Sequence, residues 1–141
     1  PYTTLFQSVN FAPHFWAAPL NGVAPKRVLF QIARGDQWIP NPVSSSLVRA
    51  AFSWETTSVY RHDRARGVQP ILPADPHAFL AFQLSPVSAP IGAATFQQAL
   101  GFLESGMNLV PNVNPLLRPL FGGMDLFETP AFLPEDPGYL P

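Results

Sequence analysis

The fold is decided by the stretch Arg27-Val28-Leu29-Phe30-Gln31-Ile32-Ala33-Arg34-Gly35-Asp36-Gln37-Trp38-Ile39-Pro40. Residues 27–33 form a short, nearly continuous apolar run with Gln31 inside it, which is typical of a strand buried on both faces of a parallel sheet. Gly35 permits a sharp exit from that strand and leaves Asp36 at its carboxyl end. The stretch therefore predicts a carboxylate on a loop that follows a buried strand.

A helix and a second strand are expected next. Asn41-Pro42 is typical of an N-cap followed by proline at the first helical position, so we expect a helix from Val43 to Ala51. Residues 56–60 are rich in β-branched side chains and predict a strand. A strand, helix, strand unit normally joins parallel neighbours. The predicted fold class is therefore α/β.

Outside this unit the sequence is less regular. Residues 1–26 form an irregular, aromatic-rich segment, and residues 62–76 are expected to be a long polar loop. A helix is predicted over residues 91–104, on which one stripe is marked by Ile91, Ala94, Gln98 and Phe102 and another by Phe96, Leu100 and Leu103. Residues 106–141 are rich in proline, and we expect them to wrap a surface rather than contribute to a core.

Two strands and two helices are too few for a stable doubly wound domain, because a parallel pair needs further strands beside it. The first strand would also present an open apolar edge. The chain begins Pro1-Tyr2-Thr3-Thr4, without an initiator Met or a signal peptide. We therefore expect a processing product or a piece of a longer polypeptide, with the other strands supplied by an earlier segment or another chain.

Composition excludes several classes of function. Only 12% of the 141 residues are charged, and the net charge is −1 with eight scattered basic residues, which argues against a nucleic-acid partner. No apolar run reaches the roughly 18–20 residues needed for a transmembrane segment. The chain has no cysteine, which excludes disulfides and thiolate metal sites. Low charge with 18 prolines and 12 phenylalanines favours a surface that is apolar or covered by a partner.

Two residues carry the candidate chemistry, Asp36 and His77. His77 lies in the loop Leu72-Pro73-Ala74-Asp75-Pro76-His77-Ala78-Phe79, after the second strand. A histidine can take the proton of a serine hydroxyl and return it to a leaving group, and a carboxylate can hold that histidine in the required tautomer. The alternatives are that Asp36 only forms a turn and caps a helix, and that His77 is a loop or packing residue.

Other residues compete for these roles. Asp75 fits a turn former before Pro76, and Asp63 is a rival acid that we expect to be paired and exposed. His14 and His62 lack acidic or histidine neighbours at metal-ligand spacing, so no zinc site is predicted. We interpret His14 as a packing residue, with a place in the lining of an acyl pocket as the alternative. For Trp38 we favour a buried position under the acid loop over a place in the lining of a substrate pocket. Residues 44–46 are three serines at a helix start, where serines serve as caps.

Taken together, these segments resemble α/β-hydrolases. Gly35-Asp36-x-x-Ile39-Pro40 resembles the loop that carries their acid, and Asp75-Pro76-His77-Ala78-Phe79 resembles their histidine loop. Most of the chain is similar to the C-terminal region of large bacterial lipase- or esterase-like hydrolases, including the closing Phe132-Leu133-Pro134-Glu135-Asp136. No Gly-x-Ser-x-Gly occurs in the chain, although the family order Ser…Asp…His requires a nucleophile segment before the acid.

The resemblance implies that residues 27–105 are the C-terminal half of an α/β-hydrolase domain, with the last parallel strands and their flanking helices, and that residues 106–141 are its proline-rich tail. It implies a carboxylic-ester hydrolase in which Asp36 and His77 are catalytic and the serine comes from an upstream segment or a companion chain. The expected substrate is an apolar ester, no cofactor is implied, and the expected location is extracellular or in the cell envelope.

A second function from a different class is also consistent with the sequence. A hydrolase-derived fragment can be kept as a non-catalytic structural or accessory subunit that docks on a larger assembly. Flanks rich in Pro and Phe with little charge are typical of a segment that wraps a partner. A companion chain or upstream segment with Gly-x-Ser-x-Gly would favour the enzyme, whereas unrelated partners would favour the scaffold.

Overall fold

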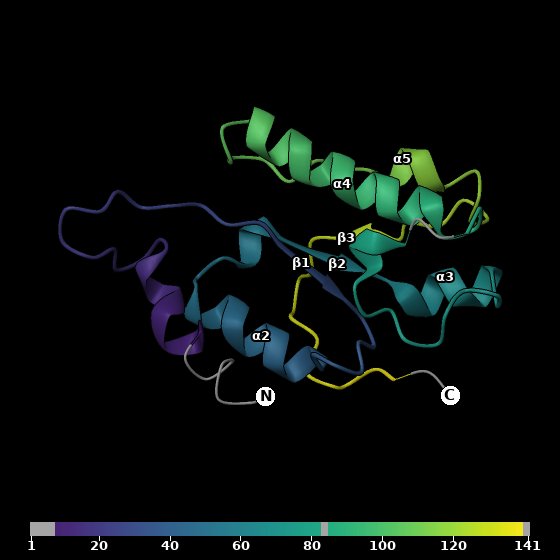
Figure 1. The fold of residues 1–141 in the computed structure, drawn as a ribbon, viewed down its shortest axis with the longest axis horizontal. Coiled ribbons are helices and arrows are strands. Elements are labelled where there is room, and N and C mark those ends of the chain that lie inside the picture. The colour runs from purple at the N-terminus through teal and green to yellow at the C-terminus, as the bar shows by residue number, and fades with distance from the viewer. Residues whose placement is uncertain (1–7, 83–84, 140–141) are drawn as a thin grey trace.

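The computed structural model describes residues 8–82 and 85–139. In chain order its elements are η1 (Ala12–His14), β1 (Phe30–Ala33), α2 (Asn41–Ala50), η2 (Trp54–Thr56), β2 (Thr57–Tyr60), α3 (His62–Val68), η3 (Phe79–Ala81), α4 (Ala89–Glu104), α5 (Asn114–Leu117) and β3 (Phe127–Glu128). The three strands form one sheet in the order β1-β2-β3 (Figure 1). The molecule therefore combines helices with a small sheet, as expected of the α/β class.

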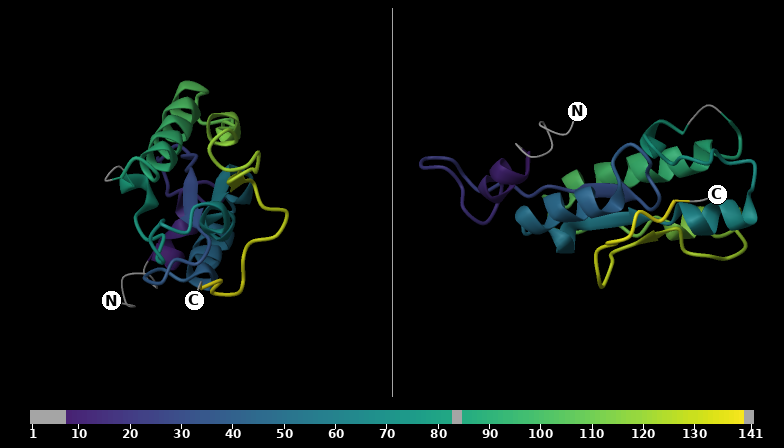
Figure 2. Two further views of the ribbon diagram at one scale, coloured as in Figure 1. Left: turned by 90° about the vertical axis from the view of Figure 1, so that its right-hand side faces the viewer. Right: turned by 90° about the horizontal axis from the view of Figure 1, so that it is seen from below.

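The sheet has mixed strand directions. β1 and β2 are parallel, with Ile32 opposite Val59, and α2 forms the connection between them. β3 is antiparallel to β2, with Phe127 opposite Tyr60. The views in Figures 1 and 2 place α4 on one face of the sheet and α2 on the other. The predicted strand, helix, strand unit with parallel strands is confirmed.

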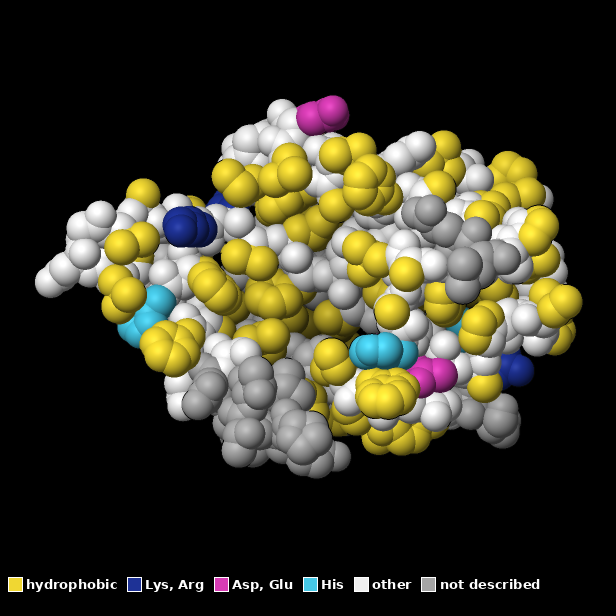
Figure 3. All heavy atoms as spheres, in the orientation of Figure 1, with side chains coloured by type: hydrophobic (Ala, Val, Ile, Leu, Met, Phe, Trp, Pro, Cys, Tyr) yellow, Lys and Arg dark blue, Asp and Glu magenta, His cyan; other side chains and the backbone are white. Residues whose placement is uncertain are grey.

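The two parallel strands differ in burial. All four residues of β2 are buried, whereas in β1 only Ala33 is fully buried. The prediction that the first strand is buried on both faces was wrong for most of its length. The physical reason is its position, because in the described part of the chain β1 lies at the edge of the sheet. In Figure 3, hydrophobic side chains gather along the middle of the molecular face between α4 and α2.

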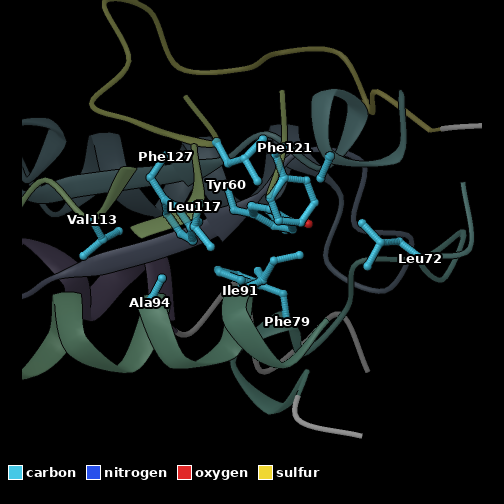
Figure 4. Close-up of a cluster of buried hydrophobic side chains, with 12 residues drawn as sticks. Tyr60, Leu72, Phe79, Ile91, Ala94, Val113, Leu117, Phe121 and Phe127 are labelled. Atoms are coloured by element: carbon cyan, nitrogen blue, oxygen red, sulfur yellow. The ribbon is translucent and has the colours of Figure 1, made fainter. Parts of the chain in front are cut away.

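The core lies between the sheet and α4. The helix buries Ile91, Ala94, Gln98 and Phe102 and leaves Phe96, Leu100 and Leu103 exposed, so the first of the two predicted stripes faces the core. Tyr60 is central to the packing, with its ring stacked on Phe79 at 5.1 Å and on Phe127 at 5.4 Å between centroids (Figure 4).

The last quarter of the chain was predicted wrongly in part. We expected residues 106–141 to wrap a surface rather than contribute to a core, but the side chains of this segment that belong to the main cluster are Val113, Leu117, Phe121, Leu126 and Phe127. Asn114 makes this possible although prolines limit regular structure. Its Oδ1 accepts the N–H groups of Leu126 and Phe127 and its Nδ2 donates to the carbonyl of Phe127. A side chain thus satisfies backbone groups that a helix or sheet would otherwise pair.

After β3 the chain runs back along α2. The Ser45 hydroxyl donates to the carbonyl of Pro134 at 2.6 Å, and Arg49 forms an ion pair with Glu135. This segment ends near the loop that follows β1.

Among the described residues, no helix combines the length and hydropathy needed to cross a bilayer.

The segment after β2 also differs from expectation. Residues 62–76 were predicted to be one polar loop, but residues 62–68 form α3. Arg61 precedes this helix and binds two acids, Asp63 through its Nε at 2.9 Å and Glu128 on β3 through Nη1 at 3.1 Å. These ion pairs join the end of β2 to β3. A charge-rich stretch without apolar periodicity gave no helix signal.

Candidate active site

Gly35 and Asn41 stabilise the conformation of the loop that carries Asp36. Gly35 has φ +89°, a conformation that favours glycine. The Asn41 side chain is fully buried, accepts the N–H of Gly35 at 2.9 Å and donates to the carbonyl of Ala33 at 2.8 Å. Asn41 was predicted as a helix N-cap, but it makes no such cap and is the first residue of α2. Its amide closes the loop that leaves β1.

Asp36 is held inside this loop by backbone donors. Its Oδ1 accepts the N–H groups of Trp38 and Ile39, each at 2.8 Å. The Asp36 side chain is 14% exposed. These two hydrogen bonds fix the orientation of the carboxylate within its own loop. They would also form if Asp36 were only a turn-forming residue.

The histidine loop is anchored on both sides of His77. Pro76 and Phe79 are buried, and Ala78 between His77 and Phe79 has φ +56°. Asp75 Oδ1 accepts the N–H of His77 at 2.9 Å, which closes a local turn. These contacts hold the backbone of His77 while its side chain remains 39% exposed.

The two loops meet at Asp36 and His77. The His77 Nδ1 lies 3.1 Å from both Oδ1 and Oδ2 of Asp36. Because a carboxylate only accepts, this contact assigns the proton to Nδ1 and leaves Nε2 as the basic nitrogen of a neutral ring. Among the residues that the structure describes, none forms a hydrogen bond with Nε2. The expected hydrogen-bond contact between the two side chains is confirmed, and their catalytic roles stay a prediction.

Two buried residues, His62 and Tyr60, support the start of the histidine loop. His62 Nε2 lies 2.8 Å from the carbonyl of Pro73, and its Nδ1 lies 3.1 Å from the Tyr60 hydroxyl. The Pro73 carbonyl requires a proton on Nε2, so in the neutral ring Tyr60 donates to Nδ1. Burial lowers the pKa of His62, and burial together with the charge of Asp63 raises the pKa of Tyr60. His62 is thus a neutral structural residue that fixes Pro73, near the start of the His77 loop.

The rival acid does not reach the histidine loop. Asp63 forms a two-point ion pair with Arg61. Burial alone would raise the pKa of Asp63, but the hydrogen bonds and charge of Arg61 bring it below its usual range. Asp63 is paired as expected, but it is partly buried rather than exposed.

The serines of residues 44–46 and His14 do not take part in the contact between Asp36 and His77. Ser45 and Ser46 lie within α2, where their hydroxyls donate to the carbonyls of Pro134 and Pro42. His14 is half-buried and its Nδ1 lies 2.6 Å from the carbonyl of Ala18. In the described ranges, no group of three or more His, Asp or Glu side chains is arranged to hold a metal ion.

Trp38 lies on the surface beside His77. The residue is 75% exposed, so a buried position under the acid loop, which was favoured from the sequence, was wrong. The indole and imidazole rings are 5.7 Å apart between centroids and inclined by 31°. Proline follows at position 40 and the loop backbone donates to Asp36, which turns the indole outward rather than into the core. Trp38 therefore forms an apolar wall next to His77.

Two contributors were missed by sequence reasoning. Asn41 was visible only as a capping residue, and Asp75 only as a turn former. A polar residue six positions after Gly35 gives no signal that its side-chain amide will bind the backbone of that glycine.

Comparisons of this chain with protein-family models, with curated proteins and with solved structures gave no match.

Proposed function

We propose that this chain supplies the acid and the base of a serine hydrolase that acts on carboxylic esters. The observation that carries the proposal is the contact between Asp36 and His77 Nδ1 at 3.1 Å, which joins the loop after β1 to the loop between α3 and η3. Parallel strands end at one edge of a sheet, where ligand sites of α/β folds lie. Asp36 orients the ring, and Nε2 takes the proton of a serine hydroxyl.

The serine comes from an upstream segment or a companion chain, and the fold proposed for the combination is that of an α/β-hydrolase. In the described part of the chain β1 lies at the edge of the sheet, which supports this, since a further strand placed there would end beside the Asp36–His77 pair. The oxyanion donors would come from the same added segment. Exposed apolar side chains beside the pair, above all Trp38, favour an apolar ester.

Reaction with a fluorophosphonate probe tests the proposal in the complete hydrolase, meaning this chain together with the serine-bearing segment. We expect mass spectrometry to find the probe on a serine outside residues 1–141. His77→Ala should abolish both labelling and ester hydrolysis, and Asp36→Asn should lower kcat by about 10⁴-fold. His14→Ala is the matched control, because His14 lies outside the site and should leave both readouts unchanged.

The alternative is a structural subunit derived from a hydrolase. The same open β1 edge and the exposed apolar side chains favour it, because both call for a partner. It predicts that native material contains partners without a reactive serine. Equal labelling of the His77→Ala variant, or no labelled serine at all, would remove the catalytic proposal in favour of this one.

A further inference from the structure

Asp75 joins the acid loop to the histidine loop through a single oxygen atom. Its Oδ1 accepts the N–H of His77 at 2.9 Å and the N–H of Gln37 at 3.2 Å. The first contact is local, and any Asx turn would provide it. The second crosses 38 residues of sequence and is not needed for the turn. Turn formation therefore accounts for only half of what this carboxylate does.

The two donors are well placed to set the geometry of the pair. Gln37 directly follows Asp36, and the other donor is the backbone of His77 itself. One oxygen thus links the backbone next to Asp36 to the backbone of His77, and the side chains of these two residues must meet. The side-chain bond between Asp36 and His77 Nδ1 starts from these two fixed points. Without the shared acceptor, no backbone hydrogen bond to Asp75 would join the two loops beside that contact.

The flanking structure makes this link more important. The Asp36 loop is fixed to β1 by Asn41, and the His77 loop is fixed by His62 at Pro73 and by buried Phe79. Each set of contacts holds its own loop to the body of the protein. Asp75 instead connects one loop directly to the other, next to the reactive groups. A shift of about 1 Å in such a contact can lower a rate by about 100-fold.

We propose that Asp75 is a positioning residue for the Asp36–His77 pair, a role that rests on the proposed function. Asp75→Ala removes the shared acceptor and leaves two N–H groups unpaired. Asp75→Asn keeps Oδ1 as an acceptor in the same place and removes only the charge. The alanine variant should therefore lose alignment, and the asparagine variant should keep it.

The first measurement is steady-state ester hydrolysis by the complete hydrolase. Asp75→Ala should lower kcat by about 100-fold with KM changed less than about threefold, because alignment and not substrate binding is lost. Asp75→Asn should restore kcat to within about tenfold of the unmodified protein. Asp125→Ala is the control: Asp125 forms an exposed ion pair with Arg118, and kcat should not change.

The second measurement does not depend on activity. Amide hydrogen exchange of Gln37 and His77 should become about tenfold faster in Asp75→Ala, the loss of roughly one hydrogen bond each, and stay slow in Asp75→Asn. Unchanged kcat in Asp75→Ala, or an asparagine variant as impaired as the alanine variant, overturns the positioning role and leaves the proposed function intact. An unmodified protein without esterase activity overturns the proposed function and this role with it, even where the exchange data show the link between the loops.

Discussion

The carbonyl oxygen of Gly138 lies 2.6 Å from the place that a β-carbon on Gly35 would occupy. The end of the described chain is therefore packed against the turn that carries Asp36. Gly35 also has a positive φ, so two independent constraints favour glycine at this position. The segment that leaves β3 thus closes over the acid loop after running along α2.

Gly35→Ala should destabilise the protein more than an ordinary glycine replacement. Gly22 provides the matched control, because its φ is +77° and an added β-carbon there meets nothing within 4 Å. Gly22→Ala should cost roughly 1–2 kcal/mol from the left-handed backbone alone. Gly35→Ala should cost about 1–3 kcal/mol more, because the carbonyl of Gly138 must move. Urea denaturation of both variants measures the difference, and equal midpoints would show that the contact with Gly138 is unimportant.

Asn41→Ala should loosen the acid loop. The variant leaves the N–H of Gly35 and the carbonyl of Ala33 without their partner in a buried place, at a cost of about 1–3 kcal/mol for each unpaired group. Chemical denaturation gives the loss of stability, for which Asn21→Ala at an exposed position is the control. A loss below about 0.5 kcal/mol, the range of ordinary surface substitutions, would contradict this account of Asn41.

Low pH should reduce the free energy of unfolding through protonation of His62. Burial lowers the pKa of this residue in the folded protein, so the unfolded chain takes up the proton more readily. The free energy of unfolding should therefore fall as the pH drops below about 6.5, the ordinary histidine value, and be fully retained above it. Asp63 acts in a separate range, since its lowered pKa places its loss of stabilisation below about pH 4.

The measurement for His62 is urea denaturation between pH 5 and 8. His62→Gln can still donate to the carbonyl of Pro73 but does not titrate, so its stability should change less with pH over this range. His14→Ala serves as the comparison for a histidine near the surface. An identical pH dependence in His62→Gln and the unmodified protein would show that His62 is not the responsible group.

Trp38→Ala should affect the substrate and not the fold. Trp38 is 75% exposed, so removal of its indole should change stability by less than about 0.5 kcal/mol. Under the proposed function it should raise KM for long-chain esters more than for acetyl esters, because the apolar wall beside His77 is lost. Trp54→Ala on η2 is the control, and an equal KM change for both ester classes would argue against contact with the acyl chain.

The sequence predicted some features well and others poorly. The parallel pair β1 and β2, the helix between them and the buried stripe of α4 follow from apolar periodicity, which is a local property. The contact between Asp36 and His77 was also anticipated, although α3 separates the His77 loop from the end of β2. Asn41, Asp75 and Asn114 were not, since each side chain binds backbone groups whose positions depend on the finished fold. The exposure of Trp38 depends in the same way on how the loop backbone turns around Asp36.

The outer edge of β1 affects how the isolated chain should behave in solution. In the described region its backbone N–H and C=O groups on that side pair with no strand. Two molecules can satisfy these groups by joining edge to edge. Light scattering of the purified chain should therefore rise with concentration, and under the proposed function the addition of the upstream segment should reverse it.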